Sequence, residues 1–375
     1  MAETLHQAAR FLVPAWPLLA ACLLLLLPTA RAAQSARLFS LTGLVMTLCL
    51  TPLLSGQDGL ARWGCLLAGC MPFLTWHPGQ KRSAACLNLL SCFVIMLALC
   101  SQRVLLVACL TTCGALILLL QETLSTARAR LAWESMRLRL AGLILTLLGT
   151  SLVTLSPDPD LLRLGDLFSA VGLCLVAGLA GFASPRDEKI SGPELALPDL
   201  LLCLSAVALM LRLPERQMTH LVLTLAGLAA LWLCVATRHQ GPRTLVALAT
   251  LASASSVGPV PAMLFMSSGF ALAALPGLPG PMRGWVQAAL PPWPGFPALG
   301  LMLAGMMKSG ITVPLLSLLA IGALASRAGL YWVLPPSSRD RSVILTLMVI
   351  GIGIPVAISV TGLSGCIWPL NWMAP

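Results

Sequence analysis

The stretch LPPWPGFPALGLML, residues 290–303, places prolines and glycines inside an otherwise apolar part of the chain. A proline in a helix interior removes a backbone donor and clashes with the preceding turn, which costs about 3 kcal/mol. The run at 290–297 therefore predicts a break between two helical segments. A second run, SASSVGPVPA at 253–262, combines serines, prolines and a glycine, and predicts a second break.

The composition indicates an integral membrane protein. The chain is 58% hydrophobic and 10% charged, with a mean hydropathy of +0.91, whereas a soluble domain carries about 25% charged residues. A membrane span needs about 20 mostly apolar residues. We expect an all-α polytopic protein with about 11–13 crossings, short loops and a single transmembrane domain over 1–375. The predicted spans are 12–30, 37–55, 61–77, 84–101, 104–121, 138–156, 166–184, 197–213, 219–237, 244–278 (long and broken), 296–326 (broken or two) and 342–364.

The distribution of basic residues predicts the orientation in the membrane. Short cytoplasmic loops collect Lys and Arg. Here twelve such residues follow the odd-numbered spans, against six in the N-terminal segment and the other loops. We therefore expect the N-terminus on the outer side. We interpret the net charge of +10 as the result of basic residues in the cytoplasmic loops, and we expect the protein to contact the lipid bilayer and not nucleic acid. The twelve are Arg31, Arg37, Lys81, Arg82, Arg128, Arg130, Arg137, Arg139, Arg186, Lys189, Arg238 and Arg243.

The sequence holds no recognisable cofactor or catalytic motif. Most of the thirteen cysteines fall in or beside apolar spans, and the four histidines lie near loops. A zinc or iron–sulfur site needs clustered ligands, so we interpret the cysteines as small packing residues. No phosphate-binding glycine loop, nucleotide fingerprint or nucleophile elbow is present. We expect no metal, no cofactor bound by this chain and no catalytic residue.

Few ionisable side chains fall near the spans, and they are the candidate proton-path residues. Such groups are costly inside a membrane and usually mark a pathway or a relay. We single out Lys308, Asp166, Arg327 and Glu122. A simpler interpretation exists for three of them: Lys308 can extend to the interface, Glu122 can end the fifth span, and Asp166 can be a helix-start charge. The sequence offers Arg327 no acid partner.

Several segments, taken in order, resemble the antiporter-like membrane subunits of respiratory complex I, of group 4 membrane-bound hydrogenases (hydrogenase-4 type) and of multisubunit sodium/proton antiporters. The proline stretch is similar to the family's G-L-P-P-x-x-G-F turn, with Pro291, Pro292, Gly295 and Phe296 at matching positions. The resemblance runs from about residue 12 to 335 and implies an antiporter-like bundle with broken helices near 253–262 and 290–297. The other matching segments are CSQRVLLVACLTTCGALIL (100–118), LAWESMRLRLAGLILTLLGTSLV (131–153), VAGLAGFASPRDEK (176–189), RTLVALATLAS (243–253) and LFMSSGFALAALPG (264–277).

The departures from the family concern its proton relay. In the family a glutamate on the fifth helix pairs with a lysine on the seventh, and further lysines or histidines continue the relay. In this sequence those positions hold uncharged residues, and a glutamate replaces one further lysine. The resemblance therefore implies a retained fold with a degenerate relay. The positions are Thr111 or Thr112, Val176, Leu272, Ala298 or Leu299, and Glu134.

These features predict a membrane-arm subunit of a complex I-like assembly, of the NADH/quinone or hydrogenase type, with a structural or coupling role. Its partners would be antiporter-like sibling subunits and a peripheral redox arm, in a bacterial or mitochondrial inner membrane. Two alternatives remain open. The chain is a divergent subunit that still translocates protons, or it is a stand-alone membrane transporter.

Overall fold

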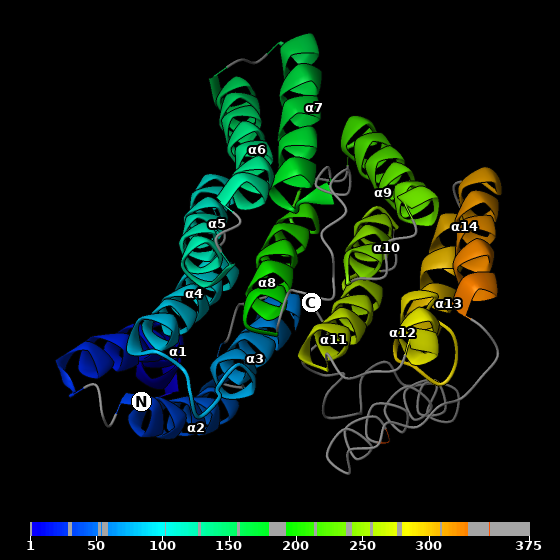
Figure 1. Ribbon diagram of the computed structural model, residues 1–375. Coiled ribbons are helices and arrows are strands. Elements are labelled where there is room, and N and C mark those ends of the chain that lie inside the picture. The colour runs from blue at the N-terminus through cyan, green and yellow to red at the C-terminus, as the bar shows by residue number, and fades with distance from the viewer. Residues whose placement is uncertain are drawn as a thin grey trace.

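The computed structural model of the chain describes residues 2–28, 32–51, 54, 59–101, 103–126, 129–155, 158–179, 193–213, 216–237, 242–255, 258–275, 280–307, 310–328 and 345. Within these ranges the chain forms fourteen helices and no strand (Figure 1). The helices are α1 (Ala2–Leu26), α2 (Ala32–Leu50), α3 (Gly59–Leu74), α4 (Arg82–Cys100), α5 (Val104–Thr126), α6 (Ala129–Leu155), α7 (Pro159–Val176), α8 (Pro193–Met210), α9 (Gln217–Thr237), α10 (Arg243–Ser253), α11 (Val260–Ala274), α12 (Gly280–Gln287), α13 (Gly295–Met307) and α14 (Thr312–Ala328).

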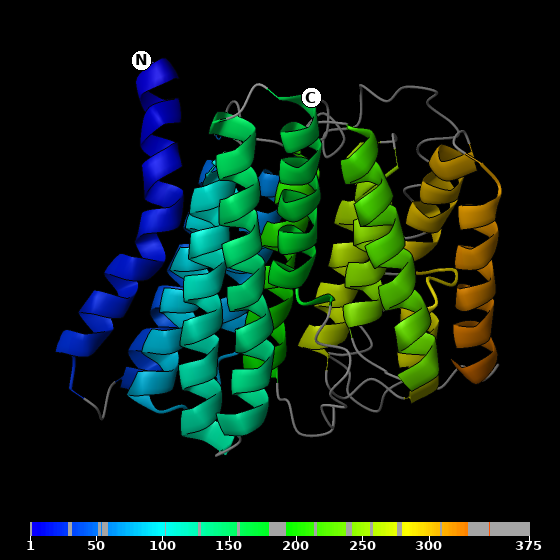
Figure 2. The same ribbon diagram turned by 90° about the horizontal axis from the view of Figure 1, so that it is seen from above.

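The helices form a bundle in which most axes run side by side (Figure 2). Four of the described helices, α4, α5, α6 and α9, are long and apolar enough to cross a membrane. Eight others carry shorter apolar segments of 10–17 residues. The all-α, multi-pass fold class predicted from the composition is confirmed.

The helix break predicted at 253–262 is present between α10 and α11. α10 ends at Ser253 and α11 begins at Val260. Gly258 lies between them with a φ of +87°, a conformation that glycine adopts readily and other residues rarely do. The turn therefore separates two half-helices, both of which still pack against α8.

The second predicted break, at 290–297, separates α12 from α13. α12 ends at Gln287, α13 begins at Gly295, and the peptide bond between Pro291 and Pro292 is cis. Trp293, in the middle of this turn, is among the most completely buried large side chains of the described chain. The middle of the turn, at Trp293 and Pro294, is thus enclosed by protein, whereas Pro291 is exposed.

The predicted spans differ from the observed helices near the C-terminal end. The sequence analysis did not predict α12, which has only eight residues and contains proline and glycine. The long segment at 296–326, predicted to be broken or two spans, is two helices as expected, α13 and α14, with Gly310 between them at a φ of +146°. The span predicted at 342–364 lies, apart from Leu345, outside the described residues.

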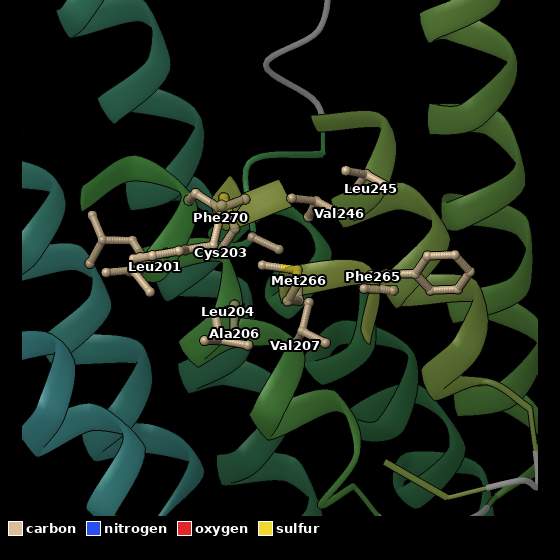
Figure 3. Close-up of a cluster of buried hydrophobic side chains, with 14 of the residues drawn as sticks. Leu201, Cys203, Leu204, Ala206, Val207, Leu245, Val246, Phe265, Met266 and Phe270 are labelled. Carbon is tan, nitrogen blue, oxygen red and sulfur yellow. The ribbon is translucent and has the colours of Figure 1, made fainter. Parts of the chain in front are cut away.

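Helix α8 is the centre of the bundle. Every side chain from Leu200 to Met210 is at most 3% exposed. α8 packs against α3, α4, α5, α7, α10 and α11, and Figure 3 shows its apolar side chains facing those of α10 and α11. A helix that is apolar on all sides is expected in such an enclosed position.

Helices α6 and α7 approach each other backbone to backbone. The contact is lined by Gly142 and Gly149 on α6 and by Gly165 and Gly172 on α7. A Cβ on Gly142 would lie 2.6 Å from the carbonyl oxygen of Gly172, and one on Gly149 would lie 2.4 Å from Oγ of Ser169. Small residues allow such close packing where lipid provides no hydrophobic driving force.

Two arginines hold the carboxyl ends of neighbouring helices. Arg212 donates hydrogen bonds to the carbonyl oxygens of Leu99 (3.1 Å) and Ser101, at the end of α4. Arg82 donates to the carbonyl oxygen of Leu27 at 3.1 Å, just beyond α1. The last carbonyls of a helix lack partners within it and carry partial negative charge, so a guanidinium stabilises them.

The glycine contact between α6 and α7 is testable with a matched pair of substitutions. Gly149→Val should drive the helices apart and destabilise the protein by about 1–3 kcal/mol, because the added carbons meet backbone and a buried side chain. The measurement is the temperature at which the detergent-solubilised protein loses its monodisperse chromatographic peak. We expect a decrease of about 5 °C.

Gly300→Val is the control, because Gly300 also lies within a helix but a Cβ there meets no atom within 4 Å. Both changes carry the same small gain in helix propensity, so a difference between the variants reports packing. Equal destabilisation of the two variants would contradict the proposed close contact.

Candidate functional site

The most buried ion pair of the described chain joins α6 to α8. Nη2 of Arg139 lies 2.6 Å from Oδ1 of Asp199, and the two side chains are 4% and 16% exposed. The same nitrogen lies 3.7 Å from Sγ of Cys203, one helical turn beyond Asp199. Gly178, just after α7, gives the guanidinium room, because a Cβ there would lie 3.3 Å from Nη2. Each charge compensates the other at a site from which water is largely excluded.

A second ion pair joins α7 to the start of α9. Nη1 of Arg216 donates to both carboxylate oxygens of Asp166 at 2.8 Å. The Asp166 side chain is 8% exposed, but that of Arg216 is 42% exposed. Solvent therefore screens this pair more than the Arg139–Asp199 pair.

The two ion pairs lie near opposite ends of α7. Asp166 is on the N-terminal half of that helix, and Gly178, beside Arg139, follows its C-terminus. Twelve residues separate these points, which corresponds to about 18 Å along a helix axis. The α6–α7 glycine contact lies between them. A proton would need intermediate carriers to pass from one pair to the other.

The positions that the sequence resemblance assigns to the family's glutamate–lysine pair are buried and uncharged. Oγ1 of Thr111 lies 2.9 Å from Oγ of Ser205, which joins α5 to α8. Both hydroxyls also contact carbonyl oxygens of their own helices. Val176, at the position of the seventh-helix lysine, is fully buried. Hydroxyl groups can donate and accept hydrogen bonds, but they do not carry a charge near neutral pH.

Apart from Glu134, whose side chain is outside the description, the remaining positions that the resemblance assigns to relay residues are also in the core. None of them carries an ionisable side chain, and all are buried. They are Thr112, Leu272, Ala298 and Leu299.

The four candidate proton-path residues do not form one cluster in the described chain. Asp166 forms the ion pair with Arg216. Glu122 is half-buried near the end of α5, at the opposite end of the bundle from the start of α7. Arg327 belongs to the last turn of α14, and its side chain is outside the description. Lys308 lies outside the described residues.

The residues of the proline turn face different surroundings. Pro291 and Phe296 are exposed, whereas Pro292 is half-buried. Gly295 begins α13, and a Cβ there would lie 3.1 Å from Cβ of Ala289. The turn therefore contributes close packing and a buried indole, and no charged group.

A third polar cluster connects three helices near the end of α1. Nε2 of Gln121 donates to Oδ1 of Asn88 at 2.7 Å, and Nδ2 of Asn88 donates to Oγ1 of Thr75 at 3.2 Å. A small hollow of about 10 Å³ beside it is lined by Ser40, Trp76 and Asn88 among others. These groups are uncharged at all ordinary pH values. In the described part of the chain, no three His, Cys, Asp or Glu residues are arranged to hold a metal ion.

The sequence analysis missed the Arg139–Asp199 pair. Arg139 was counted among the loop charges although it lies at the very start of the predicted span 138–156; α6 begins at Ala129 and places Arg139 nearly three turns inside the helix. Asp199 was expected at a span start, but α8 begins six residues earlier. Asp199 and Cys203 are four residues apart, which puts both on one helix face. Two polar side chains on one face of an apolar helix could have indicated that a polar partner from another helix lies there.

Comparisons with known proteins identify the fold. No protein-family profile and no curated protein matches the sequence. Among solved structures, 28 chains match. A chain of the respiratory complex I from Thermus thermophilus with bound aureothin aligns over 92% of this chain and 98% of its own length, with a TM-score of 0.65 and 18% sequence identity. At that identity the similarity establishes a shared fold.

The two ion pairs should differ in their effect on stability. Asp199→Asn leaves Arg139 as a buried, uncompensated charge and should cost about 3–5 kcal/mol. Asp166→Asn should cost about 1 kcal/mol or less, because water partly solvates Arg216. Thermal stability of the detergent-solubilised protein measures both effects.

A double variant tests whether Arg139 and Asp199 mainly neutralise each other's charge. Arg139→Met with Asp199→Leu removes both buried charges and should recover most of the stability lost by Asp199→Asn. A double variant as unstable as the single one would contradict the interpretation that the two side chains mainly neutralise each other.

Proposed function

We propose that this chain is a membrane-arm subunit of a complex I-like energy-converting assembly, with a structural or coupling role and without the proton relay of antiporter-like subunits. The observation that supports this most strongly is the fold shared with a chain of respiratory complex I over nearly the full length of both chains. The assembly is of the NADH/quinone or hydrogenase type. This subunit binds no cofactor, and electron transfer takes place in the peripheral arm.

The absence of a relay is inferred from the chemistry of the buried positions. Protons move between side chains whose pKa values change as their neighbours change charge. Thr111 and Val176 stand at the matching positions, and neither titrates in the required range. The acids that the structure places within the bundle are held by arginines at short distance. A guanidinium stays protonated, so such a pair does not pass a proton onward.

The ion pairs support a structural or coupling role. Arg139–Asp199 links α6 to the central helix α8, and Asp166–Arg216 links α7 to α9. Both ends of the α6–α7 hairpin are thereby tied to other helices. A bundle linked in this way moves as a unit and can carry a displacement from one neighbouring subunit to the next.

The surface of the bundle indicates what this subunit contacts in the membrane. The outward face of α6 is apolar, with Ile144, Leu147 and Leu148 exposed. Such a face fits lipid or the side of an antiporter-like sibling. The N-terminus lies on the outer side, periplasmic or intermembrane-space, as the positive loop charges predict.

The second candidate is a subunit that still translocates protons through a shifted pathway. One observation favours it: Asp166 pairs with an arginine that is 42% exposed, so water reaches that pair. A stand-alone transporter has less support, because the broken region 253–262 contains no charged residue and transporter sites at broken helices hold polar or charged groups.

Co-purification tests the proposed assembly. The tagged chain, expressed at its native level and extracted in a mild detergent, should carry with it antiporter-like subunits and iron–sulfur or nickel–iron proteins, identified by mass spectrometry. The same preparation in a harsh, subunit-dissociating detergent should lose them. A chain that purifies alone, or only with copies of itself, would refute the subunit proposal and favour the transporter.

A further inference from the structure

Two cysteines from adjacent helices lie with their sulfur atoms close together. Sγ of Cys65 on α3 is 3.7 Å from Sγ of Cys100, the last residue of α4. Cys65 is fully buried, whereas Cys100 is half-buried. A disulfide has an S–S distance of about 2.05 Å. The two sulfurs therefore need to approach by about 1.7 Å to form a disulfide.

The surroundings of Cys100 are those of a reactive thiol. Arg212 donates hydrogen bonds to the carbonyl oxygens of Leu99 and Ser101, the residues on either side of Cys100. A guanidinium is thus fixed beside the end of α4 where this thiol lies. A partly exposed cysteine next to a fixed positive charge is the usual environment of reactive cysteines, whereas buried structural cysteines are inert.

Other buried cysteines of the described chain have different environments. Cys92, also on α4, directs its thiol to the carbonyl oxygen of Ala68 at 3.2 Å. Cys203 contacts Arg139 in the buried ion pair. Each of these thiols has a packing or hydrogen-bonding role that leaves it enclosed. The pair at the end of α4 combines an accessible thiol with a second thiol in reach.

We propose that Cys65 and Cys100 form a redox-active dithiol that peroxide converts to a disulfide between α3 and α4. The Cys100 thiolate attacks one oxygen of hydrogen peroxide, the O–O bond breaks, and Cys100 becomes a sulfenic acid as hydroxide leaves. The Cys65 sulfur then attacks the Cys100 sulfur. The S–O bond breaks, water leaves with the Cys65 proton, and the S–S bond forms. In total, two thiols and one hydrogen peroxide give one disulfide and two water molecules.

The disulfide would tie together a point where three helices meet. It joins α3 to the end of α4, which Arg212 already holds from the end of α8. On the topology proposed above, this end of the bundle faces the outer compartment, which in bacteria is the oxidising one. The dithiol itself depends only on the Cys65–Cys100 geometry and not on the proposed assembly.

Mass spectrometry of the full-length chain in mild detergent tests the proposal. The protein is treated with hydrogen peroxide, denatured, alkylated with N-ethylmaleimide and digested. We expect a cross-linked peptide pair containing Cys65 and Cys100, two hydrogens lighter than the separate peptides, which dithiothreitol splits. Cys100→Ser and Cys65→Ser should each abolish it, and Cys92→Ser, a buried cysteine on the same helix, should leave it unchanged.

The rate of disulfide formation in variants of Arg212 is a second measurement. Arg212→Gln should slow disulfide formation severalfold, and Arg212→Lys, which keeps the charge, should restore most of the rate. Wild-type protein in which both cysteines are fully alkylated after peroxide would overturn the proposal. So would oxidation of Cys100 to a sulfinic acid while Cys65 remains a free thiol.

Discussion

The ion pair between Arg139 and Asp199 allows the most enclosed helix of the bundle to carry a charge. From Leu200 to Met210, α8 is surrounded by other helices, and a lone carboxylate at its start would be strongly destabilising. Arg139 compensates that charge at 2.6 Å and thereby fixes α6 against α8. The glycine contact then places α7 against α6, and Asp166–Arg216 connects α7 to α9. Two ion pairs and one glycine contact thus connect four helices.

The same arrangement supports the proposal that an antiporter-like fold persists in this chain without a proton relay. In antiporter-like proteins, which this sequence resembles, charged side chains within the bundle exchange protons. Here Asp199 and Asp166 are each held by an arginine in an interhelical ion pair. Apart from Glu134, the positions that the resemblance assigns to relay residues contain hydroxyl or apolar side chains. Closed ion pairs hold helices together but do not pass protons. Retention of the proline turn fits the same account, because its buried Trp293 contributes packing whether or not protons move.

Much of the fold could be predicted from the sequence, but the central ion pair could not. The long apolar runs and the two proline-containing breaks are local signals, and both breaks lie where the sequence places them. α12 was missed because eight residues with proline and glycine give no helical pattern. Arg139 was counted among the loop charges because charged residues shorten an apparent apolar span, although an arginine can lie within a helix when a carboxylate from another helix faces it. Such partners are distant in sequence, and the packing of the bundle brings them together: α6 packs against α5 and α7, which in turn pack against α8.

The most direct test of the lost relay is proton flux through the purified chain in proteoliposomes. A potassium diffusion potential drives protons inward, and a pH-sensitive dye inside the vesicles reports their entry. The account predicts the same rate as in protein-free vesicles. A faster flux that is abolished by Asp166→Asn, Lys308→Met or Arg327→Met alone, and retained in Gly300→Ala, would contradict it and would establish a working proton pathway.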